Sequence, residues 1–394
     1  MKGIIAMHTD ALKYLEDCSL KWELIKMEIR SATISYSKVQ ASHRREYEND
    51  LNGRYTVAHS LLEKSFTDEN FANVNFLKNE IEKINALKTE GARIRSKATF
   101  VEQNEKNSRF FINLEKKNAA IKNITRLKLE DKTEVTESSA VLHELSKFYQ
   151  NLYSSSKYDE INEPFFFNKD IPTISNIDKL MCDSAITIDE CTKALSLMKI
   201  NKSPGTDGLT VEFFRYFWDD IRVLVYDSIR SAYNSEILSF EQKRGVLRLI
   251  PKKGKDLTNV KNWRPISLLN TDYKLLTHIL AIRLQKILHT IISKDQSGYL
   301  KGRNIGTNIR SIFDVIDISE KTNSSALLAF LDFEKAFDKL NWKFLQKTLK
   351  SFGFGDSFNK WVKILYTDIE SCIINNGITS KYFKLESGIR QGCP

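Results

Sequence analysis

Hydrophobic residues recur at helical spacing along most of the chain. In the first third, Val74, Leu77, Ile81 and Ile84 repeat at intervals of three and four residues, which predicts an amphipathic helix. Two heptads are too few for a coiled coil, so we expect this helix to pack on its neighbours. Asp272 is expected to cap a long helix, whose apolar residues at helical spacing are Leu275, Leu276, Ile279, Leu280, Leu284, Ile287, Leu288, Ile291 and Ile292.

Local signals place further helices and the strands between them. Thr187 and Glu190 have the spacing of a capping box and predict a helix over 188–200. A helix is expected over roughly 338–352, ending at Gly353, and Asp356 is expected to cap another. Short apolar runs predict strands at RGVLRLIP (244–251), ALLAFLDF (326–333), 371–375 and 381–385, of which 326–333 reads as a buried strand. The pattern is that of an α+β protein.

Proline and glycine divide the chain into two parts. Residues 1–163 contain no proline, and their glycines are Gly3, Gly53 and Gly91; every proline and the other glycines lie beyond. This shift predicts a mainly α-helical N-terminal region, 1–163, followed by a loop-rich mixed part. The polar, turn-rich stretch 154–172 is the best candidate for a linker.

Composition excludes several protein classes. No apolar run approaches the roughly 18 residues that span a bilayer, and the N-terminus meets acidic residues before any long hydrophobic stretch, unlike a secretory signal. The five cysteines are scattered without a C-x-x-C pair, which favours a reducing compartment over a disulfide or zinc framework. We therefore expect an intracellular protein of the nucleus, the cytoplasm or both, neither secreted nor bound to a membrane.

The positive charge is concentrated in one part of the chain. The formal net charge is +10, and residues 201–310 hold 19 Lys and Arg against 10 Asp and Glu. Such a surplus suits a polyanion, because each phosphate contact releases condensed counterions. A solubilising surface with chance clustering is the alternative.

Three segments could carry chemistry. Asp332 ends the predicted buried strand, where a carboxylate is costly unless it is paired or binds a metal; phosphoryl-transfer enzymes place such an Asp on two Mg²⁺ ions. It could instead cap the helix that follows. The basic stretch 249–270 offers lysines and Arg264 for phosphate, or is a solvated hairpin. GIRQGCP (388–394) has glycines that let backbone approach a ligand, although alone it is an ordinary turn.

Two further segments, KSPGTDGL (202–209), by itself a weak turn signal, and QSGYLKGRN (296–304), complete an ordered series. Taken in order, the five segments resemble the successive blocks of a reverse transcriptase, and more narrowly of a non-LTR retrotransposon of the LINE type. The blocks are KSPGTDGL, IPKK with NWRPISLLN, QSGYLKGRN (296–304), AFLDFEKAFDKLNW and SGIRQGCP. Upstream, 91–124 and 143–155 resemble the linker that precedes the polymerase in that group. The resemblance extends from roughly residue 90 to the last residue.

The resemblance implies a right-hand polymerase that extends DNA on an RNA template, with fingers over 164–325 and a partial palm over 326–394. It implies an RNA template, a DNA primer and deoxynucleoside triphosphates as partners, and Mg²⁺ as the cofactor. Asp332 matches the catalytic, metal-binding carboxylate, and the backbone carbonyl of Phe333 would join the same ion. Residues matching nucleotide-binding positions are Lys252 or Lys253, Arg264, Phe337, Arg390, Gln391 and Gly392, with Arg390 and Gly392 shaping the loop. The template-handling block contributes Gln296, Gly298, Arg303 and Asn304, for which a structural role is equally open.

One part of the family pattern is missing. A second, adjacent pair of aspartates should follow the Gln-Gly loop, and the sequence reaches Pro394 without it. Because two-metal catalysis needs carboxylates from both places, we expect no detectable primer extension by this chain. A non-catalytic RNA-binding module is the alternative function, and a host protein that binds partners through its N-terminal helices is a third. The polymerase interpretation also requires Asp332 to face a cleft near Gln391 and Arg264; a carboxylate turned outward into solvent, or far from these two residues, would overturn it.

Overall fold

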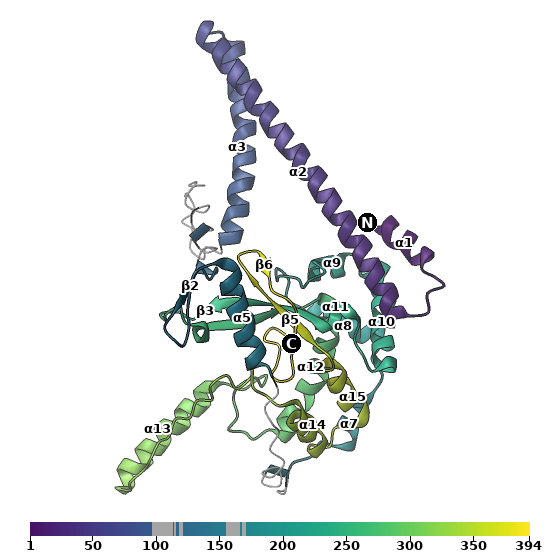
Figure 1. Ribbon diagram of the computed structural model, residues 1–394, viewed down its shortest axis with the longest axis vertical. Coiled ribbons are helices and arrows are strands. Elements are labelled where there is room, and N and C mark those ends of the chain that lie inside the picture. Colours follow the sequence, from purple (N-terminus) through teal and green to yellow (C-terminus); the bar gives the residue numbers. More distant parts are fainter. Residues whose placement is uncertain (97–112, 114–115, 118–120, 155–165, 168–170) are drawn as a thin grey trace. The chain divides into compact units, whose positions relative to one another are not determined.

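The computed structural model describes residues 1–96, 113, 116–117, 121–154, 166–167 and 171–394 (Figure 1). The chain forms two compact units. The first unit comprises residues 1–28, 137–249 and 264–394, and the second comprises 29–136 and 250–263. None of the helices in the described parts of the chain is long and apolar enough to cross a membrane.

The second unit is built on two long helices. Most of α2 (Cys18–Lys64) and all of α3 (Asp68–Ser96) belong to it. Leu51 and Ala58 of α2 pack with Val74 and Leu77 of α3, and Ile81 and Ile84 lie at the edge of this cluster. The apolar stripe predicted on α3 is therefore confirmed as a packing face. The unit also contains the two-stranded antiparallel sheet of β1 (Leu127–Lys128) and β2 (Glu134–Val135), and the 3-10 helix η1 (Val260–Asn262).

The first unit is mainly helical. Its described helices are α1 (Lys2–Ala11), α5 (Ser138–Leu152), α7 (Asn176–Asp183), α8 (Ile188–Leu197), α9 (Val211–Tyr216), α10 (Trp218–Ser235), α11 (Phe240–Lys243), α12 (Thr271–Ile291), α13 (Ile305–Thr322), α14 (Trp342–Ser351) and α15 (Asp356–Leu365). Helix α12 packs against α7 and α8, and α10 packs against α8 and α15. The capping box of Thr187 and Glu190 forms as predicted. Glu190 also pairs with the buried Arg283 of α12 at 2.7 Å, which fastens α8 to α12.

A mixed sheet lies beside these helices. Its strands are β3 (Arg244–Pro251), β4 (Trp263–Leu268), β5 (Glu370–Asn375), β6 (Ile378–Thr379) and β7 (Phe383–Lys384). The order is β4-β3-β5-β6, with β7 also paired to β5. Strand β3 runs parallel to β5, so that Val246 lies opposite Cys372, whereas β6 and β7 are antiparallel to β5. The strands predicted at 244–251, 371–375 and 381–385 are thus confirmed, and the fold is α+β.

The buried strand predicted at 326–333 is wrong. Residues 324–333 form neither strand nor helix, and Leu327, Phe330 and Leu331 are each more than four-fifths exposed. A strand needs a neighbour for its backbone N–H and C=O groups, and no strand in the described part of the chain pairs with this run. Without a partner the apolar pattern alone does not produce a strand.

Three helix starts also differ from the prediction. The helix expected from 338 begins at Trp342, because Asn341 caps it by accepting hydrogen bonds from the backbone N–H groups of Lys343 and Phe344. Helix α12 has Asn270 rather than Asp272 at its N-cap, and α15 has Gly355 rather than Asp356, which is its first residue. Much of the predicted linker 154–172, and the middle of the 91–124 segment, lie outside the described residues.

Candidate nucleotide-binding site

The Gly-Ile-Arg-Gln-Gly loop packs so closely on its neighbours that its glycines cannot be replaced. Gly388 has φ +81°, and a Cβ built there would lie 2.4 Å from the backbone oxygen of Asp338. Gly392 has φ +118°, and its Cβ would lie 2.8 Å from the backbone oxygen of Ser267. Both positions combine a left-handed backbone with contact against another main chain, which only glycine tolerates. The loop is therefore held between β4 and the segment that follows Asp332.

Gln391 is the residue through which this loop meets two other sequence blocks. Its Nε2 donates to Oδ1 of Asp338 at 2.8 Å, and its backbone oxygen accepts from the backbone N–H of Ser267 at 2.7 Å. The hydroxyl of Tyr153 donates to the same Asp338 oxygen at 3.2 Å. Asp338 is 3% exposed, so Gln391 and Tyr153 both donate to a carboxylate in the protein interior. Burial, reinforced by Asp338, raises the pKa of Tyr153 well above its ordinary value, so the phenol stays protonated as the donor.

Arg390 points into the protein rather than toward solvent. It is 3% exposed, its Nη2 donates to the backbone oxygen of Lys243, and its guanidinium lies 5.2 Å from the ring centre of Tyr273. Its Nε and Nη1 have no hydrogen-bond partner. In this position Arg390 connects the loop to the backbone of Lys243 and the ring of Tyr273 in the protein interior.

Phe337 lies next to the loop and contacts an aromatic residue that sequence reasoning missed. The backbone N–H of Ile389 donates to the Phe337 carbonyl at 2.8 Å. The Phe337 ring is 46% exposed and meets Tyr299 edge-on, with ring centres 5.5 Å apart. Tyr299 belongs to the QSGYLKGRN block, has φ +63° and is 81% exposed. A lone tyrosine inside a polar, glycine-containing loop was the signal that could have drawn attention to it.

The four residues predicted to handle template take part in local structure. Arg303 donates through Nη2 to the backbone oxygen of Ile292 at 3.0 Å and through Nη1 to that of Gln296 at 2.7 Å, beyond the end of α12. Asn304 is the N-cap of α13 and accepts from the N–H of Gly306 at 2.8 Å. Gln296 donates to the backbone oxygen of Gly298 at 3.4 Å. These contacts do not test a role toward template.

The basic residues predicted to hold phosphate are accessible. Arg264 is exposed on β4, on the strand face opposite Ser267. Lys252 and Lys253 belong to the second unit, where Nζ of Lys252 donates to the backbone oxygen of Lys261 at 3.0 Å and Lys253 is exposed.

Asp332 does not lie where a buried metal ligand is expected. The residue is exposed, as is Phe333 at 77%, within the run that does not form a strand. Among the described residues no group of three or more His, Cys, Asp and Glu side chains is arranged to hold a metal ion. Near the Gln391 loop, Oδ1 of Asp338 accepts hydrogen bonds from Gln391 and Tyr153.

Comparisons with known proteins identify the domain that contains this loop. Residues 250–394 match the family described as reverse transcriptase (RNA-dependent DNA polymerase). The chain is 34% identical over 377 residues to the transposon TX1 uncharacterized 149 kDa protein of Xenopus laevis, covering 95% of this chain and 28% of that relative. The chain carries a reverse transcriptase domain of the non-LTR retrotransposon type.

Other relatives agree with this assignment. The Pol polyprotein of the type-2 retrotransposable element R2DM of Drosophila melanogaster is 28% identical over 54% of this chain and 19% of its own length. The RNA-directed DNA polymerase from the mobile element jockey, also of Drosophila melanogaster, is 25% identical over 40% of this chain and 17% of its own length. The chain thus spans less than a third of each of these relatives.

The reverse transcriptase assignment does not depend on the position of Asp332. Asp332 is exposed, and an orientation of its carboxylate toward a cleft near Gln391 and Arg264 stays a prediction. The order of the sequence blocks predicted the right family. Segments far apart in sequence also meet in the structure: hydrogen bonds join three residues of the blocks, Ser267, Asp338 and Gln391, with Tyr153 of the 143–155 segment.

Proposed function

We propose that this chain is the nucleotide- and template-binding part of an RNA-directed DNA polymerase, with fingers and a partial palm of the right-hand type. The supporting observation is the hydrogen bond from Gln391 to Asp338, 2.8 Å long. It ties the glycine loop to the segment that carries Phe337 and Asp332, and the loop is also bonded to the strand that carries Arg264. Arg264, Phe337 and Gln391 would then contact the phosphates, sugar and base of an incoming nucleotide. Polymerases of this family use Mg²⁺, and Asp332 is the residue that would belong to its site.

The test is equilibrium binding of a fluorescent RNA-template, DNA-primer duplex by anisotropy over a range of salt concentrations. Arg264→Ala should weaken binding and reduce the slope of log K against log salt by roughly one, the change expected when a single phosphate is no longer neutralised. Arg222→Ala is the matched control, because Arg222 is half-exposed on α10 and pairs with Asp219 at 3.7 Å on the same helix. Equal effects of the two substitutions would refute the proposed phosphate contact.

A second candidate is a non-catalytic RNA-binding module, and the exposure of Asp332 favours it. Primer extension with Mg²⁺ or Mn²⁺ tests whether the chain is catalytic. We expect no extension product from this chain, an outcome that both candidates allow. Extension that is abolished by Asp332→Asn but not by Asp219→Asn, which changes an exposed aspartate on α10, would show that the chain is catalytic after all.

A further inference from the structure

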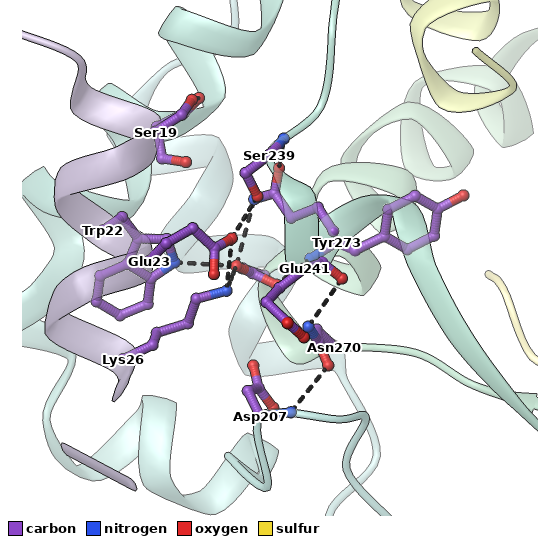
Figure 2. Close-up of polar contacts among 12 residues, drawn as sticks. Ser19, Trp22, Glu23, Lys26, Asp207, Ser239, Glu241, Asn270 and Tyr273 are labelled. Carbon is purple, nitrogen blue, oxygen red and sulfur yellow. Dashed lines mark hydrogen bonds and ion pairs between the residues drawn. The ribbon is translucent and has the colours of Figure 1, made fainter. Parts of the chain in front are cut away.

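The first turns of α2 carry a lysine into the interior of the first unit. Lys26 is 2% exposed, and its Nζ donates to Oδ2 of Asp272 at 2.9 Å and to Oε1 of Glu23 at 3.1 Å. Trp22, one turn earlier, is fully buried and donates from Nε1 to the same Asp272 oxygen at 2.9 Å. Figure 2 shows Trp22, Glu23 and Lys26 turned from α2 toward Ser239 and the region around Asn270 and Asp207. These residues all belong to the first unit.

The cluster holds more negative than positive charge. Glu23, Asp207 and Asp272 are 8%, 5% and 0% exposed, and Lys26 is the ammonium bonded to two of them. The third carboxylate, Asp207, has an oxygen, Oδ2, without a hydrogen-bond partner. Burying an ionised carboxylate is costly unless it is paired, so removal of the Lys26 ammonium would leave Glu23 and Asp272 without the cation to which they are bonded.

The titratable groups around Lys26 lie on its own helix α2, on α12 and in the segment that carries Asp207. Burial alone would lower the pKa of Lys26, but Asp272, Glu23 and Asp207 outweigh it and hold that pKa above the ordinary value. Burial raises the pKa of Glu23, and burial with the repulsion of Asp272 raises that of Asp207 to about 7. On α12, burial lowers the pKa of Lys274 despite the attraction of Asp207 and Asp272.

Neutral donors complete the shell around these acids. The hydroxyl of Ser239 donates to Glu23, and Nε2 of Gln242 donates to Asp272 at 3.2 Å. Neither supplies a positive charge.

The cluster is continuous with the strand that carries Arg264. Asn270 lies between β4 and α12, and its Oδ1 accepts from the hydroxyl of Thr206 at 3.2 Å and from the N–H of Asp207 at 3.4 Å. Its Nδ2 donates to the backbone oxygen of Glu241 at 3.2 Å (Figure 2). Asp272, two residues after Asn270, accepts the hydrogen bond from Lys26. The N-terminal segment is thereby connected to the junction of β4 and α12 by side chains rather than by chain continuity.

We propose that Lys26 is a positioning residue, a charged latch that fastens residues 1–28 to the junction of β4 and α12 and makes this segment an integral part of the unit that contains the reverse transcriptase loop. The fastening of this segment is supported by the hydrogen bonds of Trp22 and Lys26 described above. Its effect on nucleic-acid binding, through Arg264 on β4, rests on the proposed function.

The test replaces Lys26 by methionine, which keeps the length of the side chain and removes the charge. At pH 8 the equilibrium constant for unfolding should rise about 10²- to 10³-fold, the usual effect of leaving a buried partner unpaired. At pH 5 the penalty should be much smaller, because the orphaned acids can take up protons. Lys21→Met, on the same helix with a partly exposed side chain, is the matched control and should change little at either pH.

The state of the latch is read from Trp22 after labelling with 5-fluorotryptophan, with the ¹⁹F signals assigned by Trp→Phe variants. In Lys26→Met the Trp22 signal should be shifted or broadened at pH 8 and move back toward its native position at pH 5. Destabilisation that is the same at both pH values would overturn the proposal, because simple packing damage does not titrate.

A second variant covers the case in which Lys26→Met does not fold. Lys26→Met combined with Asp272→Asn removes the ammonium together with one of the acids it neutralises, and should restore part of the stability. A double variant no more stable than Lys26→Met would overturn the latch.

Binding of the primer–template duplex then tests the positioning role. At a pH where the Trp22 signal of Lys26→Met is native-like, its affinity should recover toward that of Lys21→Met, and where the signal is displaced the affinity should fall several-fold. Affinity independent of the Trp22 signal would overturn positioning. Failure of the proposed function is distinguishable, because the unmodified chain would then not bind the duplex at all.

Discussion

Replacing Gly205 by alanine should disrupt the contact between two sequence blocks that are far apart in the chain. Gly205 is in the KSPGTDGL block, and a Cβ built on it would lie 2.0 Å from Oδ1 of Asn270, 2.4 Å from the Asn270 nitrogen and 2.6 Å from the carbonyl carbon of Leu269. Two of these three atoms are backbone, so no rotamer change relieves the overlap.

The loss of stability has two parts, the overlap itself and the hydrogen bonds that Asn270 would lose. Overpacking a tight site typically costs about 1–3 kcal/mol. Any movement of Asn270 also weakens its bonds from Thr206 and Asp207, each contributing about 1 kcal/mol. The expected decrease in the free energy of unfolding for Gly205→Ala is therefore about 3–5 kcal/mol.

Two other glycines serve as controls. Gly208 has φ +74° and open space around it, so Gly208→Ala meets only backbone strain of about 1–2 kcal/mol. Gly53 is exposed within α2 with nothing within 4 Å, so Gly53→Ala should stabilise by up to about 1 kcal/mol. Urea unfolding followed by tryptophan fluorescence gives the order through the transition midpoints. If Gly205→Ala costs no more than Gly208→Ala, the two blocks do not dock as described.

Three further outcomes are expected. Tyr153→Phe removes one donor to Asp338 and should lower the free energy of unfolding by about 1 kcal/mol, measured by thermal denaturation. Cys191 is fully buried and burial raises its pKa to about 12, so at pH 8 it should react with a thiol reagent only after unfolding, whereas the partly exposed Cys18 should react in the folded chain. Burial raises the pKa of Asp207 from 3.8 to about 7, so between these values folding takes up a proton. Its contribution to stability should be full below about pH 3.8 and be lost as the pH rises through about 7. A denaturation series over pH should show that decline flattened in Asp207→Asn.

Local sequence signals predicted those parts of the fold that depend on nearby residues. The capping box of Thr187 and Glu190 formed because its atoms lie within one turn, and the stripe on α3 formed because the facing helix directly precedes it in sequence. Strand 326–333 failed for the opposite reason. Its apolar pattern says that the run can be buried, but whether it forms a strand depends on a partner that local pattern does not reveal.

The sequence allowed us to predict which segments contribute to the candidate site, but not how their side chains contact one another. Gln391 and Gly392 were singled out correctly as parts of a tight loop, and the close approach at the glycines explains why. The pairing of Asp338 with Gln391 and Tyr153 was not foreseen, since these residues lie 53 and 185 positions away from Asp338. The hydrogen bond between Lys26 and Asp272 joins residues 246 positions apart, and the local sequence around neither residue predicts it.

The solvent exposure of the apolar segment 326–333 affects how the phenotype of a substitution at Asp332 should be interpreted. In ALLAFLDF, Asp332 is the single charged side chain, and several of its apolar neighbours face solvent. Short apolar runs with high β-propensity self-associate, and one flanking charge often suffices to keep separate molecules apart. Asp332→Asn therefore removes a gatekeeper as well as a carboxylate, and reduced function in that variant could come from aggregation. Asp332→Glu, which keeps the charge, should remain monodisperse by light scattering and thus separates colloidal behaviour from chemistry.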